Sequence, residues 1–420
     1  MGAEAEKFGV FAADGSPLPF EGDQSIVAIF ARLVERHGWH EEREHEGGPV
    51  VALRRGASSI TLEPGAQLEL SGAPQESIHQ ICAEFRGHMA ELRDVSDDLG
   101  IRWLGLGFHP FARQSELPWV PKRRYTVMRE YLPTRGSGAL DMMRRTATVQ
   151  ANVDFDGEDD AMRKLRVGLR LSPLVAAMFA NSPWHEGHPS GDRSLRTRVW
   201  LHMDPDRSGL LPFAWHDALS YRRYVEYALD APMFLIWREG DIVSNTSQTF
   251  RRFLADGLRG YHATMGDWLL HLNTLFPEVR LKRTIELRSA DAQATDLVCA
   301  LPALWKGVLY CPQALQKAEA LGERWGYDEA MASLDGIARD ALRARLAGRE
   351  VAAWAGDLIE IAEGGLERLS HLDRKGQDER IHLARLRELV AAGRCPADVL
   401  LEGVGDGPHF MERVLTQARV

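Results

Sequence analysis

The sequence predicts an α+β protein in which a sheet with one polar, concave face precedes a helical C-terminal region. Segments with the two-residue period of half-buried strands recur from the first residues to about residue 310. From Pro312 onward the pattern is almost entirely that of amphipathic helices. We therefore expect a sheet-bearing region at 1–310 and a helical region at 311–420 that packs on the same core.

The strongest strand signal is the segment 59–72, which reads S-I-T-L-E-P-G-A-Q-L-E-L-S-G. Alternate positions are apolar, and Glu63, Gln67 and Glu69 fall on the opposite side. The Pro64-Gly65 step predicts a bend, because proline cannot donate to a strand ladder. Oxygen ligands of this kind suit Mg²⁺. The alternative is an ordinary solvated face, since antiparallel sheets often have one wet side.

Other segments share this alternation and carry acidic, amide or basic residues on one face, namely 2–6, 146–153, 195–202 and 282–288. The segment 195–202 predicts a strand on which Arg196 and Arg198 point to the same side. The segment 282–288 predicts a strand with Lys282, Glu286 and Arg288 on one face. Shorter strands are expected at 103–108 and 232–238, and a hairpin is expected to pair 50–53 with the opening strand.

The first helix is predicted at 24–37, where Asp23 can cap it and Gly38 can end it. Further helices are expected after Pro74, at 158–171 and, with a break, at 250–276.

Several polar strand faces in one sheet would combine an acidic region with an arginine region. Acidic groups hold metal ions, and metal ions together with arginines hold phosphates and carboxylates. The transfer of a phosphoryl group from a metal–nucleotide requires that combination. The sequence contains no G-x-x-x-x-G-K-[ST] motif, so any ATP is not held by a P-loop.

The composition excludes several classes of protein. The formal net charge of −9 over 420 residues leaves no general basic surface for nucleic acid. No apolar run approaches the length that spans a membrane, and no basic-then-apolar leader opens the sequence, so we expect a cytoplasmic protein. Four cysteines without a C-x-x-C pair make neither a disulfide scaffold nor a zinc finger.

Long motifs follow one another in a specific order: G-A-E-A-E-K-F-G at 2–9, A-S-S-I-T-L-E-P-G-A-Q-L-E-L-S-G-A-P at 57–74, H-Q-I-C-A-E at 79–84, L-D-M-M-R-R-T-A-T-V-Q-A-N-V-D-F at 140–155, F-P-E-V-R-L-K-R-T-I-E-L-R at 276–288 and C-A-L-P-A-L-W at 299–305. In these motifs the chain resembles the plant and proteobacterial type of glutamate–cysteine ligase. The resemblance implies a glutamine-synthetase-like fold, in which helices flank an antiparallel sheet bowl. It also implies ATP- and Mg²⁺-dependent joining of the glutamate γ-carboxyl to the cysteine amine through a γ-glutamyl phosphate, the first step of glutathione biosynthesis. The expected partners are glutamate, cysteine and ATP, and the expected state is a monomer or a weak homodimer.

The resemblance and the strand faces together suggest a role for each polar residue. The expected Mg²⁺ ligands are Glu4, Glu6, Glu63, Glu69, Glu286, Gln150 and Asn152. The expected glutamate-binding residues are Arg145, Thr148, Arg196 and Arg198, because a guanidinium grips a carboxylate with two hydrogen bonds. The expected nucleotide-binding residues are Lys282, Arg283 and Arg288, and Arg145 and Arg288 are also expected to act on the reacting groups. For any one of these residues the alternative is a solvated strand position or a surface ion pair.

The cysteines allow two interpretations. From the residues alone, Cys82 and Cys299 are small buried hydrophobes, since disulfides are uncommon in the cytoplasm. The resemblance implies instead that they form the regulatory disulfide of the family, while Cys311 and Cys395 are expected to be free thiols.

Two alternatives to the expected activity stay open. One is a ligase of the same fold that uses a different amine, and the other is a regulatory homologue without catalysis.

Overall fold

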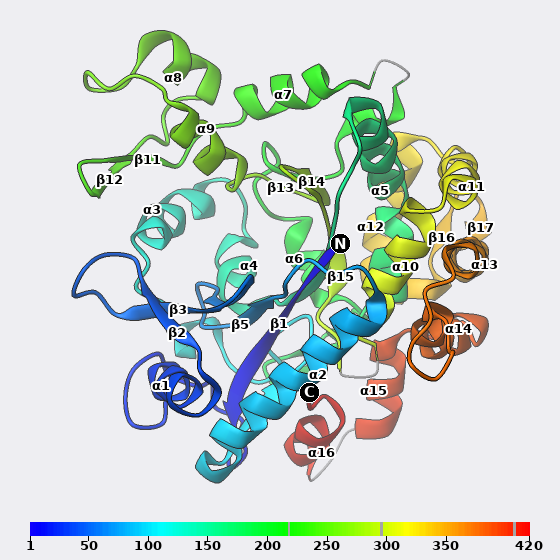
Figure 1. Cartoon of the computed structure of the whole chain (residues 1–420), viewed down its shortest axis with the longest axis horizontal. Coiled ribbons are helices and arrows are strands. Elements are labelled where there is room, and N and C mark those ends of the chain that lie inside the picture. Colours follow the sequence, from blue (N-terminus) through cyan, green and yellow to red (C-terminus); the bar gives the residue numbers. More distant parts are fainter. Residues whose placement is uncertain (217–218, 295–296, 406–408) are drawn as a thin grey trace.

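The computed structural model describes residues 1–216, 219–294, 297–405 and 409–420. Its centre is a nine-stranded sheet in the order β14-β15-β7-β1-β5-β4-β3-β2, with β6 also paired to β1 (Figure 1). Neighbouring strands are antiparallel throughout. The strands span β1 Gly2–Phe11, β2 His40–Arg43, β3 Val50–Arg55, β4 Ser58–Leu62, β5 Leu68–Ser71, β6 Ile101–Leu104, β7 Thr148–Val153, β14 Val279–Leu281 and β15 Ile285–Asp291.

The register of the sheet decides which side chains share a face. β1 pairs with β5, so that Glu6 lies opposite Glu69, and with β7, so that Glu4 lies opposite Gln150. β15 extends the sheet beyond β7 and adds Glu286. Because residues directly opposite each other in an antiparallel pair point to the same side, the polar positions of separate strands form one surface.

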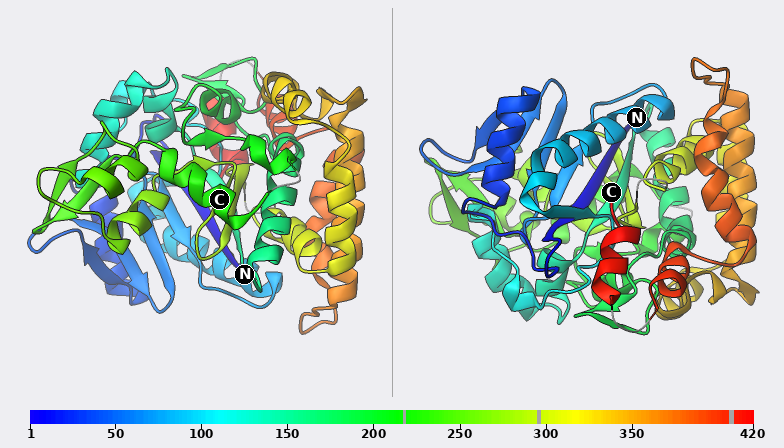
Figure 2. Two further views of the ribbon diagram at one scale, coloured as in Figure 1. Left: turned by 90° about the horizontal axis from the view of Figure 1, so that it is seen from above. Right: turned by 90° about the horizontal axis from the view of Figure 1, so that it is seen from below.

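The other face of the sheet is apolar and is covered by helices. The helix α5 Glu158–Met178 packs on β15, and α10 Ala300–Leu309 packs on β7 and on α13 Val351–Leu369. One buried apolar cluster contains Ile60 and Ala151 of the sheet together with Leu304 and Leu358 of the C-terminal helices. The C-terminal helices, yellow to orange, stand together on one side of the sheet in both views of Figure 2.

The remaining elements surround this centre. The other α-helices are α1 Ile26–His37, α2 Ile78–Ser96, α3 Arg123–Tyr131, α4 Ala139–Arg145, α6 Leu195–Trp200, α7 Tyr221–Asp230, α8 Phe250–Asp256, α9 Met265–Leu272, α11 Pro312–Gly322, α12 Tyr327–Asp340, α14 Ala384–Ala391, α15 Pro396–Val404 and α16 Phe410–Gln417. The short 3-10 helices are η1 Asp97–Leu99, η2 Gln114–Glu116, η3 Leu132–Thr134, η4 Pro212–Trp215, η5 Ala341–Arg343 and η6 Glu379–Leu383. Short strands pair as β8 Trp184–His185 with β9 His188–Pro189, β10 Ser208–Gly209 with β13 Phe276–Pro277, β11 Leu235–Arg238 with β12 Asp241–Ser244, and β16 Arg345–Leu346 with β17 Arg349–Glu350. In the part of the chain that the structure describes, no helix combines the length and the apolar character needed to span a membrane.

The segment 59–72 is a hairpin rather than one bent strand. β4 and β5 pair with Thr61 opposite Glu69, and the Pro64-Gly65 step lies in the connection between them. A Cβ atom on Gly65 would lie 2.3 Å from the carbonyl oxygen of Arg144, so only glycine fits this close approach. The reversal keeps Glu63 and Glu69 on the same side of the molecule.

Two predictions about neighbouring elements are corrected by the structure. β3 pairs with β2 and β4 rather than with the opening strand. Helix α1 is capped by Ser25, whose Oγ accepts a hydrogen bond from the Ala28 amide at 3.2 Å, and not by Asp23. Its predicted end at Gly38 is confirmed, because Gly38 has a φ of 68°, in the left-handed region that glycine favours.

The predicted strand at 195–202 is wrong, because these residues form helix α6. Ser194 caps this helix by accepting a hydrogen bond from the Thr197 amide at 3.0 Å, and its own hydroxyl donates to Asp291 at 2.9 Å. A buried long-range partner therefore overrides the alternating pattern. Residues two apart on a helix point in different directions, so Arg196 and Arg198 diverge instead of pointing together.

The buried His271 predicts a pH-dependent stability. Burial lowers its pKa from 6.5 to about 4, so the unfolded chain takes up a proton at this site before the folded chain does. The free energy of unfolding should therefore fall as the pH drops from 6.5 to 4, by about 1.4 kcal/mol for each unit of pKa shift. His271→Gln, which does not titrate, should flatten this part of the profile in urea unfolding at several pH values. An unchanged slope would contradict the prediction.

Candidate functional site

The polar face of the sheet forms one wall of a cavity of about 370 Å³. The rest of the lining comes from α3, from the start of β11 and from the segment that runs from the end of α9 to β13. We call this cavity the bowl; the polar residues that line it are Glu4, Glu6, Glu63, Glu69, Arg124, Gln150, Asn273, Thr274, Arg280, Glu286 and Arg288.

Three glutamates of the bowl have a raised pKa, because burial and neighbouring carboxylates disfavour their charged form. Burial, followed by repulsion from Glu69 and Glu286, raises the pKa of Glu4 to about 8. Burial, followed by repulsion from Glu63 and Glu69, raises the pKa of Glu6 well above its usual range. The pKa of Glu63 is raised for the same reasons, burial first and then Glu69. A cation bound among these carboxylates would offset their mutual repulsion and favour their charged form. Clustered carboxylates of this kind are typical of metal sites.

The carboxylates are also oriented by specific partners. The Asn152 side-chain amide donates to Glu4 at 2.8 Å, and the Thr148 backbone amide donates to Glu6 at 2.9 Å. In the part of the chain described, no three carboxylates of the bowl have oxygens within 4.8 Å of one another. The set therefore fits ions that take one or two carboxylates each and complete their shell with phosphate oxygens and water, as Mg²⁺ does.

Glu286 has a different environment from the other glutamates. Arg280 Nη2 lies 2.7 Å from one of its oxygens, Lys282 Nζ lies 3.0 Å from the other, and Arg288 also pairs with it. Although burial raises the pKa of Glu286, Arg280, Arg288 and Lys282 hold it far below its usual range. Glu286 is thus an anion fully matched by cations in this structure, and its predicted role as a metal ligand stays a prediction.

The predicted nucleotide-binding residues divide into two groups. Arg288 lines the bowl and donates to Gln150 Oε1 at 3.0 Å, and Lys282 reaches the bowl edge through its ion pair with Glu286. Arg283 lies between β14 and β15, is exposed and does not line the bowl.

The predicted glutamate-binding residues are also separated. Arg196 is buried, lines a second cavity of about 400 Å³ rather than the bowl, and donates to the Arg288 carbonyl at 2.8 Å. Its charge lowers the pKa of Glu6 against the effect of burial, which raises it. The Thr148 hydroxyl donates to the Ala290 carbonyl at 2.7 Å and so belongs to the sheet ladder.

Arg145 and Arg198 lie outside the lining of the bowl. Arg198 pairs with Asp192 at 2.8 Å and with Asp335. Arg145 is buried beside Phe108 and lies 3.3 Å from Glu186. Helices α4 and α6 therefore place Arg145 and Arg198 outside the set of residues that lines the bowl with its glutamates.

Sequence reasoning missed two basic residues of the bowl. Arg124 lines the cavity at the start of α3, and both Arg124 and Lys122 lower the pKa of Glu63 against burial, which raises it. Arg280 lies directly opposite Glu286 in the β14–β15 pair. The basic run P-K-R-R-Y at 121–125 was the signal for Arg124, and the short turn between 281 and 285, which pairs the strands on either side of it, was the signal for Arg280.

Cys82 and Cys299 form a disulfide with their Cα atoms 5.8 Å apart, the pairing that the resemblance implied. Cys311 and Cys395 are free and buried.

A sheet bowl of buried carboxylates beside arginines, flanked by helices, defines the class of glutamine-synthetase-like ligases. The model described as glutamate-cysteine ligase family 2 (GCS2) matches residues 1–417. The chain belongs to this family, and the resemblance found in the motifs is confirmed.

Relatives and solved structures agree with this membership. The chain is 42% identical over 405 residues to the chloroplastic glutamate–cysteine ligase of Brassica juncea, covering 96% of this chain and 77% of that protein. It is 41% identical to the Arabidopsis thaliana protein of the same name, covering 96% and 76%. The fold resembles that of a glutamate–cysteine ligase from Francisella tularensis in complex with AMP, with a TM-score of 0.57, 13% identity and coverage of 99% and 86%. It also resembles a bifunctional glutathione synthetase from Pasteurella multocida, with a TM-score of 0.51, 13% identity and coverage of 99% and 50%.

These comparisons confirm the predicted fold class and the prediction that the protein is a ligase. The predicted cytoplasmic location is wrong on this comparison, because the relatives that match along most of the chain are named as chloroplastic proteins.

Proposed function

We propose that this ligase uses ATP, with Mg²⁺ held by the bowl, to join the γ-carboxyl of glutamate to the amine of cysteine. The γ-carboxylate attacks the terminal phosphorus of ATP, and ADP leaves. The cysteine amine then attacks the γ-glutamyl phosphate, loses a proton, and expels inorganic phosphate. The observation that carries the proposal is the clustering of the buried carboxyl groups of Glu4, Glu6 and Glu63 on one face of the bowl, where burial and mutual repulsion raise their pKa values.

The residues of the bowl have complementary roles in this proposal. Glu4, Glu6, Glu63 and Glu69, with Gln150 and Asn152, would hold Mg²⁺, which supplies neutralisation of the negative charge on the transferring phosphate. Glu286 keeps Arg280 and Arg288 in place beside this set.

The arginines would act on the substrates rather than on the metal. Arg288, with Lys282 at the edge, provides positive charge for the phosphates. Arg196 lines the second cavity, next to the Arg288 backbone, and would bind a substrate carboxylate there. We do not extend the proposal to Arg198 and Arg283, whose side chains the structure places in a surface ion pair and in an exposed turn.

The test is the release of ADP from purified protein with Mg·ATP and glutamate, with each amino acid offered as the amine. Cysteine should give the highest kcat/KM, and its product should be the γ-glutamyl dipeptide by mass spectrometry. A second amine that exceeds cysteine would identify the other open alternative, a ligase of the same fold with a different acceptor. Absence of ADP release with every amine would favour a regulatory homologue.

A further inference from the structure

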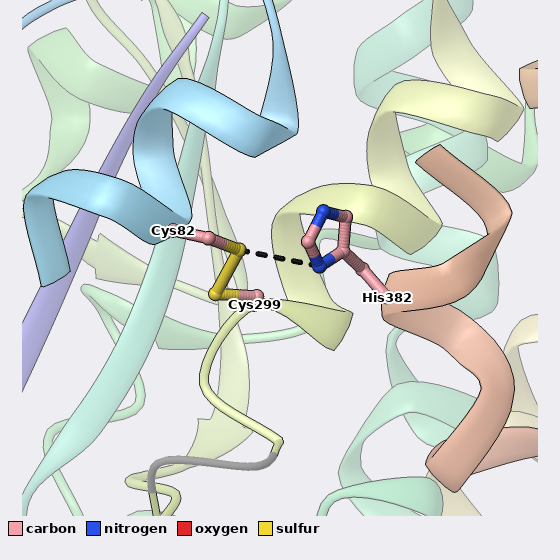
Figure 3. Close-up of side chains that lie close together, drawn as sticks. All are labelled: Cys82, Cys299 and His382. Atoms are coloured by element: carbon pink, nitrogen blue, oxygen red, sulfur yellow. Dashed lines mark hydrogen bonds between the residues drawn. A yellow bond between two sulfur atoms is a disulfide. The ribbon is translucent and has the colours of Figure 1, made fainter. Parts of the chain in front are cut away.

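A histidine of η6 lies beside the Cys82–Cys299 disulfide. His382 Nδ1 lies 3.4 Å from Cys82 Sγ. Figure 3 shows the His382 ring beside the disulfide. The Cys82 and Cys299 sulfurs and a ring nitrogen of His382 all lie within 4.8 Å of one another. These ligands come from α2, from the residue that precedes α10, and from η6. We propose that reduction of the Cys82–Cys299 bond opens a Zn²⁺ site formed by Cys82, Cys299 and His382.

The spacing of the atoms fits zinc. Zn²⁺ binds thiolate sulfur at about 2.3 Å and imidazole nitrogen at about 2.0–2.1 Å with tetrahedral angles, which separates a sulfur ligand from a nitrogen ligand by roughly 3.5 Å. The observed separation of 3.4 Å between Cys82 Sγ and His382 Nδ1 already matches this value. The two sulfurs must move apart when their bond is broken, and water completes the fourth position.

The histidine is held in the orientation that a ligand needs. His382 Nε2 lies 3.0 Å from His79 Nδ1, within hydrogen-bonding distance. In the tautomer in which His382 Nε2 donates to His79, Nδ1 presents its lone pair to the sulfurs. A second hydrogen bond of this kind is the usual support of a zinc-bound histidine. His79 is therefore a positioning residue for the site.

The three elements stay together without the disulfide. Glu379, at the start of η6, is fully buried; it accepts a hydrogen bond from the Ile78 amide at 2.7 Å and pairs with Lys306 of α10 at 2.8 Å. One carboxylate thus ties η6 to the beginning of α2 and to α10. The ligands of the reduced site are consequently preorganised by the fold.

The chemistry is that of a thiol exchange followed by metal binding. A dithiol supplies two electrons and two protons to the Cys82–Cys299 bond and is itself oxidised to a disulfide, which leaves two protein thiols. Zn²⁺ then displaces both thiol protons to the solvent. Sulfur and imidazole ligands favour Zn²⁺ over Mg²⁺, so this site and the oxygen-lined bowl select different metals.

The test uses Co²⁺ as a spectroscopic substitute for Zn²⁺ on the full chain. The protein is reduced with a water-soluble phosphine, which becomes the phosphine oxide, separated from it without air, and titrated in excess Mg²⁺ to occupy the oxygen ligands. Reduced protein should bind one equivalent with a thiolate-to-cobalt charge-transfer band and the intense visible bands of tetrahedral cobalt. Stoichiometric Zn²⁺ should abolish these bands, and oxidised protein should show none.

Variants separate the site from other thiols. Cys82→Ser and His382→Ala should each weaken Co²⁺ binding by at least about 100-fold, and His79→Ala by about 10- to 100-fold. Cys311→Ser and Cys395→Ser, which alter the free buried thiols, should leave the titration unchanged. Reduced wild-type protein without the charge-transfer band overturns the proposal, as does a band of equal strength in Cys82→Ser, in His382→Ala or in oxidised protein.

Discussion

Replacing Glu69 with glutamine is expected to lower kcat/KM for the ligation by about 100- to 1,000-fold, the equivalent of several kcal/mol of charge stabilisation. Glu69 lines the bowl, and its repulsion adds to the effect of burial in raising the pKa of Glu4, Glu6 and Glu63. In the wild type, Thr61 and Ser71 each donate to a different oxygen of Glu69 at 2.9 Å. Glutamine has the same length, accepts one of these hydrogen bonds with its oxygen, and can donate to the other hydroxyl with its amide. The substitution therefore removes the charge with little change in packing.

A binding measurement separates a metal role from a merely structural one. Mg²⁺ with ATP should raise the Tm of the wild type, because a ligand that binds only the folded state stabilises it. Glu69→Gln should lose most of this increase while keeping the basal Tm. Glu41→Gln, the same change on the exposed edge strand β2, is the matched control and should behave as the wild type. Near-full activity in Glu69→Gln would remove Glu69 from the metal set.

Replacing Arg280 with methionine is expected to lower the free energy of unfolding by about 3–5 kcal/mol, the usual cost of removing one partner of a buried ion pair. Arg280 lies 2.7 Å from Glu286, and both side chains are buried. Its Nη1 also donates to the Asn273 and Leu275 carbonyls, each at 3.0 Å. Methionine fills much of the volume but leaves Glu286 and the two carbonyls without these donors.

Equilibrium unfolding in urea measures this effect. Arg283→Met, three residues along in an exposed position, is the matched control and should change the free energy of unfolding by less than about 0.5 kcal/mol. Arg280→Lys should fall between the two, because an ammonium group cannot reach the carboxylate and both carbonyls together. Equal stability of Arg280→Met and Arg283→Met would show that the pair adds nothing to folding.

Local sequence alone determined which residues share a face of each strand. The two-residue period placed Glu4 with Glu6, Gln150 with Asn152, and Glu286 with Arg288, and the structure brings all three pairs to one side of the sheet. The order of the motifs also determined the family, which the comparisons confirm. These features were accessible because side-chain alternation and motif order depend on neighbouring residues only.

The tertiary structure decided which strand faces lie next to each other and where the local alternation of polar and apolar residues does not form a strand. Alternation predicted a strand at Arg196 and Arg198, but the buried bond between Ser194 and Asp291 sets a helix there and separates the two arginines. The partners of Glu286 and the meeting of Cys82 with Cys299, 217 residues apart, likewise depend on register and on the packing of distant elements. Local periodicity carries no information about such long-range pairings, since the same alternating face is compatible with many neighbours until the core selects one.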